Sequence, residues 1–374
     1  MYRKYRLSGR SFVKLSSEFF EKISRAGAQA PSGDNLQPWS FSSDGDTLLV
    51  KHDPQRDLSL FNVQHLASFI ALGAVLENIS IAATNESYQA EFELFPDGQS
   101  VDLIARVTFS RGIERDSLAD FLFDRCTNRK PYSSQPLRPE IFRNLDAEAA
   151  RFPTAALYWV KEKNALGRLG NIVSQADRFL FENPQIHNHF FSTLRWSQAE
   201  VESTRDGLPI RSLELGRVGS LAFRCLKPWS VVNFLNSFGF SRATANHSLA
   251  LMRRCSAGGL LTVPDASLHA FLQAGRVFQR IWLQATKENL ATQPMTAVIF
   301  LQLRSRLAEY NGLTQEQIRT VNELRRDLET FFALPADRVP AMVFRIGYAP
   351  GPTARTIRRG VTDKLEMKKQ KRSV

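Results

Sequence analysis

A polar turn near the N-terminus carries the residue types best suited to hold a ligand. The stretch 30–39 contains two prolines, a glycine, a serine, an aspartate and an asparagine, which favour a shaped turn over a helix or a strand. Gly33 tolerates backbone angles that other residues avoid, so polar atoms here can approach a ligand closely. Ser32 and Asn35 offer short hydrogen-bonding groups. The residues alone are also compatible with a capped loop that covers the core with Trp39.

A second stretch has the composition of a phosphate site. Arg125 and Arg129 flank the hydroxyl of Thr127, and Lys130 follows directly. Arginine side chains bind phosphate through two parallel hydrogen bonds, and a threonine hydroxyl can add a third. A solvated basic turn has the same composition, so the residues by themselves leave both interpretations open.

A third basic stretch, 352–359, lies near the C-terminus. Arg358 and Arg359 are its candidate anion ligands, and the residues give no reason to prefer one over the other. A basic surface run is the alternative interpretation.

Apolar spacing and turn residues predict the elements that must position these stretches. The first half predicts a helix over 17–29, a hairpin around Asp44-Gly45-Asp46, a long apolar helix over 65–85, and strands over 90–94 and 101–109. The second half predicts strands over 154–160, 260–263 and 341–346, helices over 164–183, 267–289 and 314–333, and a mostly helical segment over 187–250. The overall class is α+β, with an antiparallel or mixed sheet flanked by helices.

Two of the long helices resemble each other at a constant offset. When Gly73 is set against Gly275 (275 − 73 = 202), Thr84 meets Thr286, and several apolar positions and a glutamate agree as well. This agreement favours a duplication, although two ordinary core helices would share apolar positions by chance. A duplicated unit can pack as an internal pseudo-dimer, with the geometry that a homodimer would use.

The three stretches resemble motifs of the nitroreductase superfamily. Pro31, Ser32, Asn35, Gln37 and the pair Pro38-Trp39 match its P-S-x-x-N-x-Q-P-W stretch, which holds the isoalloxazine ring of FMN. Residues 125–129 resemble its R-x-S-x-R motif, with threonine in place of serine, and residues 344–359 resemble its closing R-x-G-Y and basic segment.

The resemblance implies roles for single residues. Arg125 and Thr127 would meet the FMN phosphate and ribityl chain, Arg129 would lie near the pyrimidine ring, and Arg358 or Arg359 would reach the phosphate. The implied cofactor-binding residues are Pro31, Ser32, Gly33, Asn35, Gln37, Arg125, Thr127, Arg129, Arg358 and Arg359.

The order of the motifs is reversed relative to ordinary nitroreductases, in which the flavin lies at a homodimer interface. The resemblance is therefore to the twin-domain, Acg-like branch, in which one chain would assemble one flavin site between two nitroreductase-like halves. We expect these halves at 1–118 and 119–374, with a helical insertion at about 187–250 and a basic tail at 366–374. A weaker R-x-S-x-R match lies at 6–10.

The implied activity is an FMN-dependent oxidoreductase that takes hydride from NAD(P)H and reduces a nitroaromatic, a quinone or a similar acceptor. Flavin carries this chemistry, so no catalytic side chain and no metal are expected. A non-catalytic flavin store or sensor, with a lid formed by 187–250, is the alternative. A specialised flavin chemistry, such as dehydrogenation of a peptide or azoline, is a third possibility.

Composition limits the classes of partner and the cellular compartment that we expect for this protein. The 374-residue chain has a net charge of +12, part of it in the C-terminal tail, which suits phosphorylated ligands but brings no recognisable nucleic-acid motif. No apolar run long enough to span a membrane and no secretory signal is evident, so we expect no membrane partner. Three scattered cysteines favour a reducing cytoplasm. A monomer built as a pseudo-dimer, or a weak homodimer, is expected.

Overall fold

The computed structural model describes residues 16–98 and 101–361. The first sheet pairs β1 (Trp39–Asp44), β2 (Thr47–His52), β3 (Tyr88–Leu94) and β4 (Leu103–Arg111) in the order β1-β2-β4-β3. All three pairings are antiparallel, and the predicted hairpin turn joins β1 to β2. Helix α1 (Ser17–Gly27) precedes the sheet, and the Phe19 backbone N–H donates to the Ser16 hydroxyl, a favourable N-terminal cap.

The second sheet has the same arrangement. It pairs β5 (Ala156–Val160), β8 (Ala257–Val263), β9 (Ala291–Pro294) and β10 (Val339–Gly347) in the order β5-β8-β10-β9, again antiparallel throughout. Helix α3 (Pro139–Ala150) precedes this sheet as α1 precedes the first. In both sheets a long helix follows the second strand in the row: α2 (Leu66–Thr84) after β2, and α11 (Leu268–Lys287) after β8.

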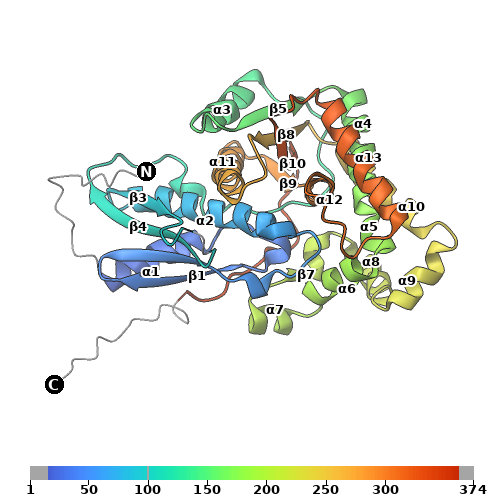
Figure 1. Ribbon diagram of the computed structural model, residues 1–374, viewed down its shortest axis with the longest axis horizontal. Coiled ribbons are helices and arrows are strands. Elements are labelled where there is room, and N and C mark those ends of the chain that lie inside the picture. The colour runs from blue at the N-terminus through green and yellow to red at the C-terminus, as the bar shows by residue number, and fades with distance from the viewer. Residues whose placement is uncertain (1–15, 99–100, 362–374) are drawn as a thin grey trace.

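Helices α2 and α11 pack on each other in the middle of the molecule (Figure 1). A Cβ atom on Gly73 would lie 1.9 Å from the Leu272 carbonyl oxygen, and a Cβ on Gly275 would lie 1.9 Å from the Ile70 carbonyl oxygen. Only glycine permits this approach. The aligned glycines of the sequence therefore mark one reciprocal helix crossing.

Helix α2 is apolar on all sides because it lies at the centre of the core. Together with the turn before it, Val63–Thr84 has the length and composition of a membrane span, but 94% of its most apolar window is buried inside the protein. Its burial identifies it as a core helix.

The remaining helices form two groups. Helix α4 (Lys163–Asp177) packs with α12 (Ala297–Arg306) and α13 (Gln315–Phe331) beside the second sheet. Between α4 and β8 the chain forms α5 (Phe179–Glu182), α6 (Pro184–Thr193), α7 (Gln198–Thr204), α8 (Gly216–Cys225), α9 (Trp229–Asn236) and α10 (Phe240–Arg253). The short strands β6 (Leu194–Arg195) and β7 (Leu208–Pro209) form a parallel pair within this segment.

Most predicted elements are confirmed, with four differences. The predicted helix over 164–183 is divided into α4 and α5, and helices α3 and α12 and strand β9 were not predicted. The basic tail and the 6–10 motif lie outside the described residues.

Candidate functional site

The loop between α1 and β1 folds as a chain of tight turns. Asp34, Asn35 and Gln37 all have left-handed backbone angles, with φ of 46°, 58° and 55°. The Gln37 backbone N–H donates to the Ser32 hydroxyl at 2.9 Å and closes the loop on itself. Short polar side chains tolerate such angles better than bulky ones. The result is a rigid loop that presents Pro31, Ser32 and Gly33 on one side.

This side of the loop faces a cavity of about 540 Å³. Ser32 and Thr127, which the sequence predicts to meet around one ligand, both line this cavity and a smaller neighbouring one of about 90 Å³. Their expected proximity is confirmed, while their role as ligands of a cofactor stays a prediction. Pro31 and Arg129 line both cavities as well, and Gly33 lines the larger.

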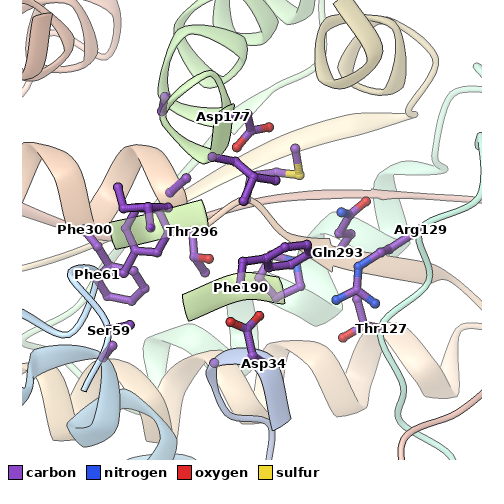
Figure 2. Close-up of a pocket in the computed structure, with 18 of the residues that line it drawn as sticks. Asp34, Ser59, Phe61, Thr127, Arg129, Asp177, Phe190, Gln293, Thr296 and Phe300 are labelled. Atoms are coloured by element: carbon purple, nitrogen blue, oxygen red, sulfur yellow. The ribbon is translucent and has the colours of Figure 1, made fainter. Parts of the chain in front are cut away.

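Figure 2 shows how side chains from different elements converge in the larger cavity. Asp34 points into it from the N-terminal loop and faces Phe190 of α6. Arg129, Thr127 and Gln293 lie at one side, and Ser59, Phe61 and Phe300 at the other, with Asp177 at the far wall. The cavity is therefore mostly apolar and aromatic, with polar groups on several of its walls.

Two arginines lie next to each other at the smaller cavity. Arg125 and Arg358 both donate to the Gln29 carbonyl oxygen, at 2.9 Å and 3.3 Å. The Arg125 guanidinium also lies over the Trp282 ring, 4.4 Å from its centroid, and its Nε is buried without a hydrogen-bond partner. Within 16–98 and 101–361, no carboxylate pairs with either guanidinium.

The electrostatics of this pair favour an anionic ligand at the smaller cavity. Burial lowers the pKa of Arg125 to about 10, and burial together with repulsion from Arg125 lowers the pKa of Arg358 to about 9. A guanidinium keeps its proton in proteins, so the cost of two neighbouring buried cations must be offset by a counter-charge. The exposed Arg355 lines the same small cavity and adds to the positive potential there.

The C-terminal segment after β10 carries Arg358 back to the first half of the molecule. Its guanidinium donates to the carbonyl oxygens of Ala28 and Ala30, at 3.0 Å and 3.1 Å, and to the Asn35 side-chain oxygen at 2.7 Å. Sequence positions more than 320 residues apart thus form one wall of the site.

Asn35 and Gln37 hold this wall together. The Asn35 amide donates to the backbone oxygens of Gly207 and Ile357 at 3.1 Å and 3.0 Å, while its oxygen receives Arg358. The Gln37 side-chain oxygen accepts from the Arg359 backbone N–H at 3.0 Å. All polar atoms of the Asn35 amide are therefore used within the protein.

These contacts change what the sequence suggests for three residues. Asn35 lines the smaller cavity, but Gln37 and Arg359 line neither of the two. The Arg359 guanidinium instead donates to the backbone oxygens of Gln37 and Trp39, at 3.0 Å and 3.3 Å. Of the two C-terminal arginines, Arg358 is the one placed beside Arg125.

Arg129 occupies the larger cavity opposite Asp34 (Figure 2). Its Nη1 donates to the Ser212 carbonyl oxygen at a long 3.4 Å. Burial lowers the pKa of Arg129, and Asp34, Tyr132 and Glu214 partly compensate. The guanidinium thus retains donors that are directed at the cavity.

Sequence reasoning missed the acidic groups of the cavity. Burial raises the pKa of Asp34 to about 6, with Asp57 acting in the same direction and His189 and Arg129 against it. Burial also raises the pKa of Asp57. His189 Nε2 is buried and has no hydrogen-bond partner. Asp34 lies in the polar stretch 30–39, but its residue type alone does not indicate that it is buried in the cavity.

The helical insertion covers the cavity. His189 and Phe190 come from α6, Phe223 from α8, and Thr244 and Ser248 from α10. The expectation that 187–250 could provide a lid is consistent with this placement. Its residues add Phe190 and Phe223 to the aromatic wall, which no motif in the sequence indicated.

No family model matches the chain. A curated relative, "Uncharacterized protein MT1398" of Mycobacterium tuberculosis (strain CDC 1551 / Oshkosh), is 27% identical over 345 residues, which cover 91% of this chain and 47% of that protein. The chain therefore spans about half the length of this relative.

Several solved structures show a distant similarity. The FMN and NADPH-dependent nitroreductase NfnB from Sphigopyxis sp. strain HMH is 12% identical, with a TM-score of 0.39, over 67% of this chain and 98% of its own. The FMN-dependent nitroreductase NfnB from Mycobacterium smegmatis in complex with NADPH is 13% identical, with a TM-score of 0.37, over 66% and 96%. Oxidized iodotyrosine deiodinase bound to FMN and 3-iodo-L-tyrosine is 10% identical, with a TM-score of 0.36, over 65% and 95%.

Proposed function

We propose that this protein binds FMN and acts as a nitroreductase-like oxidoreductase that takes electrons from NAD(P)H. The observation that carries the proposal is the pair Arg125 and Arg358, two neighbouring cations without a carboxylate partner in the described ranges. They line the smaller cavity, which shares residues such as Ser32 and Thr127 with the larger cavity. The larger cavity is wide and aromatic enough for a flavin-sized ligand.

The residues present fit the cofactor in three respects. Arg125 has a buried unpartnered Nε at the small cavity, where a phosphate group would satisfy it. Ser32 and Thr127 line both cavities and offer hydroxyl partners to a polyol chain. Trp282 and Phe278 line the larger cavity and offer an apolar surface to a ring system.

When bound, FMN would accept a hydride from NAD(P)H and pass both electrons to an acceptor. The protein's part is to bind, to orient and to set the electrostatics. Arg125 would bind the phosphate through its unpartnered Nε. Arg358, whose five N–H groups all donate to protein oxygens, would stabilise the phosphate by its positive charge. The loop at Ser32 and Gly33 would border the ring. Arg129 would stabilise negative charge that develops on the ring, as a preorganised cation in a site of low dielectric.

We further propose that the chain is an internal pseudo-dimer of the twin-domain, Acg-like kind. Support comes from the identical strand order of the two sheets and from the reciprocal crossing of α2 and α11. The halves would meet at about residue 118, so that loops from both border one site. The second, symmetry-related site would lack the polar turn and would be empty.

The acceptor class follows from the cavity wall. Aromatic side chains such as Phe61, Phe190 and Phe300 suit a flat apolar molecule, and a nitroaromatic or a quinone has this shape. We infer a reducing compartment such as the cytoplasm, since Cys126, Cys225 and Cys255 are all free.

The test is to purify the protein, add FMN, and follow binding by flavin fluorescence and then anaerobic bleaching by NADH or NADPH. We expect tight binding, bleaching, and loss of binding in Arg125→Gln. The exposed Arg326→Gln on α13 is the matched control and should bind FMN normally. If neither NADH nor NADPH bleaches the bound flavin, the oxidoreductase activity is contradicted and the flavin store remains as the function. Absence of FMN binding by the folded protein would overturn the proposal as a whole.

A further inference from the structure

Apolar side chains gather on the outer surface of α8, α9 and the turn after α9. The outer patch, as we name it, consists of Val218, Leu221, Val231, Phe234 and Phe238. Val218 is 84% exposed and Phe238 77% exposed. Scattered single hydrophobic residues are ordinary on a protein surface, but a contiguous group indicates a binding surface.

The spacing of the patch makes it one face of each helix. Val218 and Leu221 are three residues apart on α8, and Val231, Phe234 and Phe238 follow the i, i+3, i+7 pattern. The rings of Phe234 and Phe238 are in contact, with centroids 5.4 Å apart. The apolar residues on α9 and in the turn after it therefore include a contacting aromatic pair, with Val218 and Leu221 exposed on the neighbouring helix α8.

The opposite faces of the same helices are already packed against the protein. Phe223 of α8 stacks on Phe191 of α6 with centroids 5.0 Å apart, and Val232 of α9 is fully buried. Figure 1 shows α8 and α9 at one end of the molecule, next to α6. The inward packing of Phe223 and Val232 therefore fixes α8 and α9 with the patch residues exposed to solvent.

The chain segment that carries the patch has charged residues of one sign. From residue 215 to residue 264 the sequence contains no aspartate and no glutamate. The basic residues in this range are Arg217, Arg224, Lys227, Arg242, Arg253 and Arg254. An amphipathic helix with apolar side chains and flanking cations is the composition that binds an anionic bilayer surface.

We propose that the outer patch docks this protein on the surface of an anionic lipid bilayer. The helices would lie in the interface, with Phe234 and Phe238 inserted between the lipid headgroups and the cations above them. A second copy of the chain is a poorer occupant, because an isologous contact would bring the same cations face to face. A spanning segment is not needed for surface binding, so this proposal revises the expectation of no membrane partner.

The test is co-sedimentation of the full chain with vesicles of phosphatidylcholine alone and of phosphatidylcholine mixed with phosphatidylglycerol. We expect binding to the mixed vesicles only, weakened by added salt. Phe234→Ser with Phe238→Ser should reduce the partition coefficient at least roughly tenfold, since each removes buried apolar area. Ile113→Ser, at a residue that is 37% exposed and lies outside the patch, is the control for surface hydrophobicity.

Charge is tested separately with Arg217→Gln, Lys227→Gln and Arg242→Gln combined. Each cation near an anionic surface contributes roughly fivefold to binding, so the triple variant should lose most of it. The control neutralises three exposed cations outside the patch: Arg138 before α3, Arg143 on α3 and Lys163 at the start of α4. Both variants keep the basic C-terminal residues, so a difference in vesicle binding between them measures the contribution of the cations near the patch.

Three results would overturn the proposal. They are no binding of the folded protein to anionic vesicles, equal loss in the patch and control variants, or a dimer in sedimentation equilibrium that the phenylalanine substitutions dissociate. The last result would identify a second copy as the occupant of the patch. None of these measurements depends on FMN binding, so they are independent of the proposed oxidoreductase activity.

Discussion

Gly73 and Gly275 occupy equivalent places at the crossing of α2 and α11, each with its missing side chain directed at a backbone oxygen of the other helix. The partners, Leu272 and Ile70, are separated by the same 202 residues as the two glycines (272 − 70 = 202). The core of the molecule thus depends on a contact that no other residue type could make without moving a helix.

The first prediction concerns this contact. Gly73→Ala and Gly275→Ala should each lower the free energy of unfolding by about 3 kcal/mol, because the new methyl group meets a backbone atom that cannot move alone. Chemical denaturation measures the change. Gly167→Ala on α4 is the control, since its Cβ would meet the flexible Arg253 side chain at 3.3 Å. An equal loss of stability in all three variants would contradict a specific requirement for glycine at the crossing of α2 and α11.

The second prediction concerns Asn35. Asn35→Ala removes three hydrogen bonds at a buried position with positive φ, so we expect a loss of about 2–4 kcal/mol in unfolding free energy. It should also weaken FMN binding, because Arg358 loses one of its two side-chain acceptors. Asn289→Ala is the matched control, at an exposed asparagine with a similar φ of 55°. A variant as stable as this control would contradict the role of Asn35 as a clamp.

The third prediction concerns Asp34 and an anionic ligand. With a pKa raised to about 6 by burial, the Asp34 carboxyl is largely neutral at about pH 5 and ionised at about pH 8. Its charge shares a cavity with the proposed ligand, so Asp34→Asn should bind FMN a few-fold more tightly at about pH 8 and equally at about pH 5. Titration of flavin fluorescence at several pH values measures the ratio. A ratio that does not change with pH would refute the prediction.

The fourth prediction concerns stability at Asp177, which accepts a hydrogen bond from the Ser248 hydroxyl. Burial raises the pKa of Asp177 to about 6. The folded state therefore binds more protons than the unfolded state between about pH 4 and about pH 6, and stability falls as the pH rises through this window. Asp177→Asn should be more stable than the natural protein at about pH 7, by an amount on the order of 1 kcal/mol.

The gain at Asp177 should vanish at about pH 4, where the carboxyl is protonated in the folded protein. The exposed Asp327→Asn on α13 is the control and should show no such pH dependence. A difference between Asp177→Asn and the natural protein that is the same at both pH values would contradict the assignment.

Much of the fold was predictable because its elements are long and regular. Helix α2 and the β1–β2 hairpin follow directly from apolar spacing and from the turn at Gly45. Helix α12 and strand β9 were not predicted, each for a different reason. The first is apolar on most sides and lacks a clear period, and the second is four residues long and ends in Pro294.

The candidate site was predictable in outline and not in detail. Motif residues such as Ser32 and Thr127 lie in one cavity, which their types and order suggested. The sequence does not reveal which polar atoms are used up inside the protein, so Asn35 and Gln37 could not be separated from residues that face the cavity. The contribution of α6, α8 and α10 to the cavity wall depends on tertiary packing, which the local spacing of apolar residues does not reveal.

The attachment of Arg358 to the loop at Ala28 and Asn35 has a consequence for how the protein is made. A chain emerging from the ribosome exposes its polar turn first and acquires this arginine only after more than 300 further residues have been made. The wall shared by Asn35 and Arg358 would therefore form late relative to the turn itself. A product that ends between these two residues would lack this wall and, on the proposed function, would remain colourless.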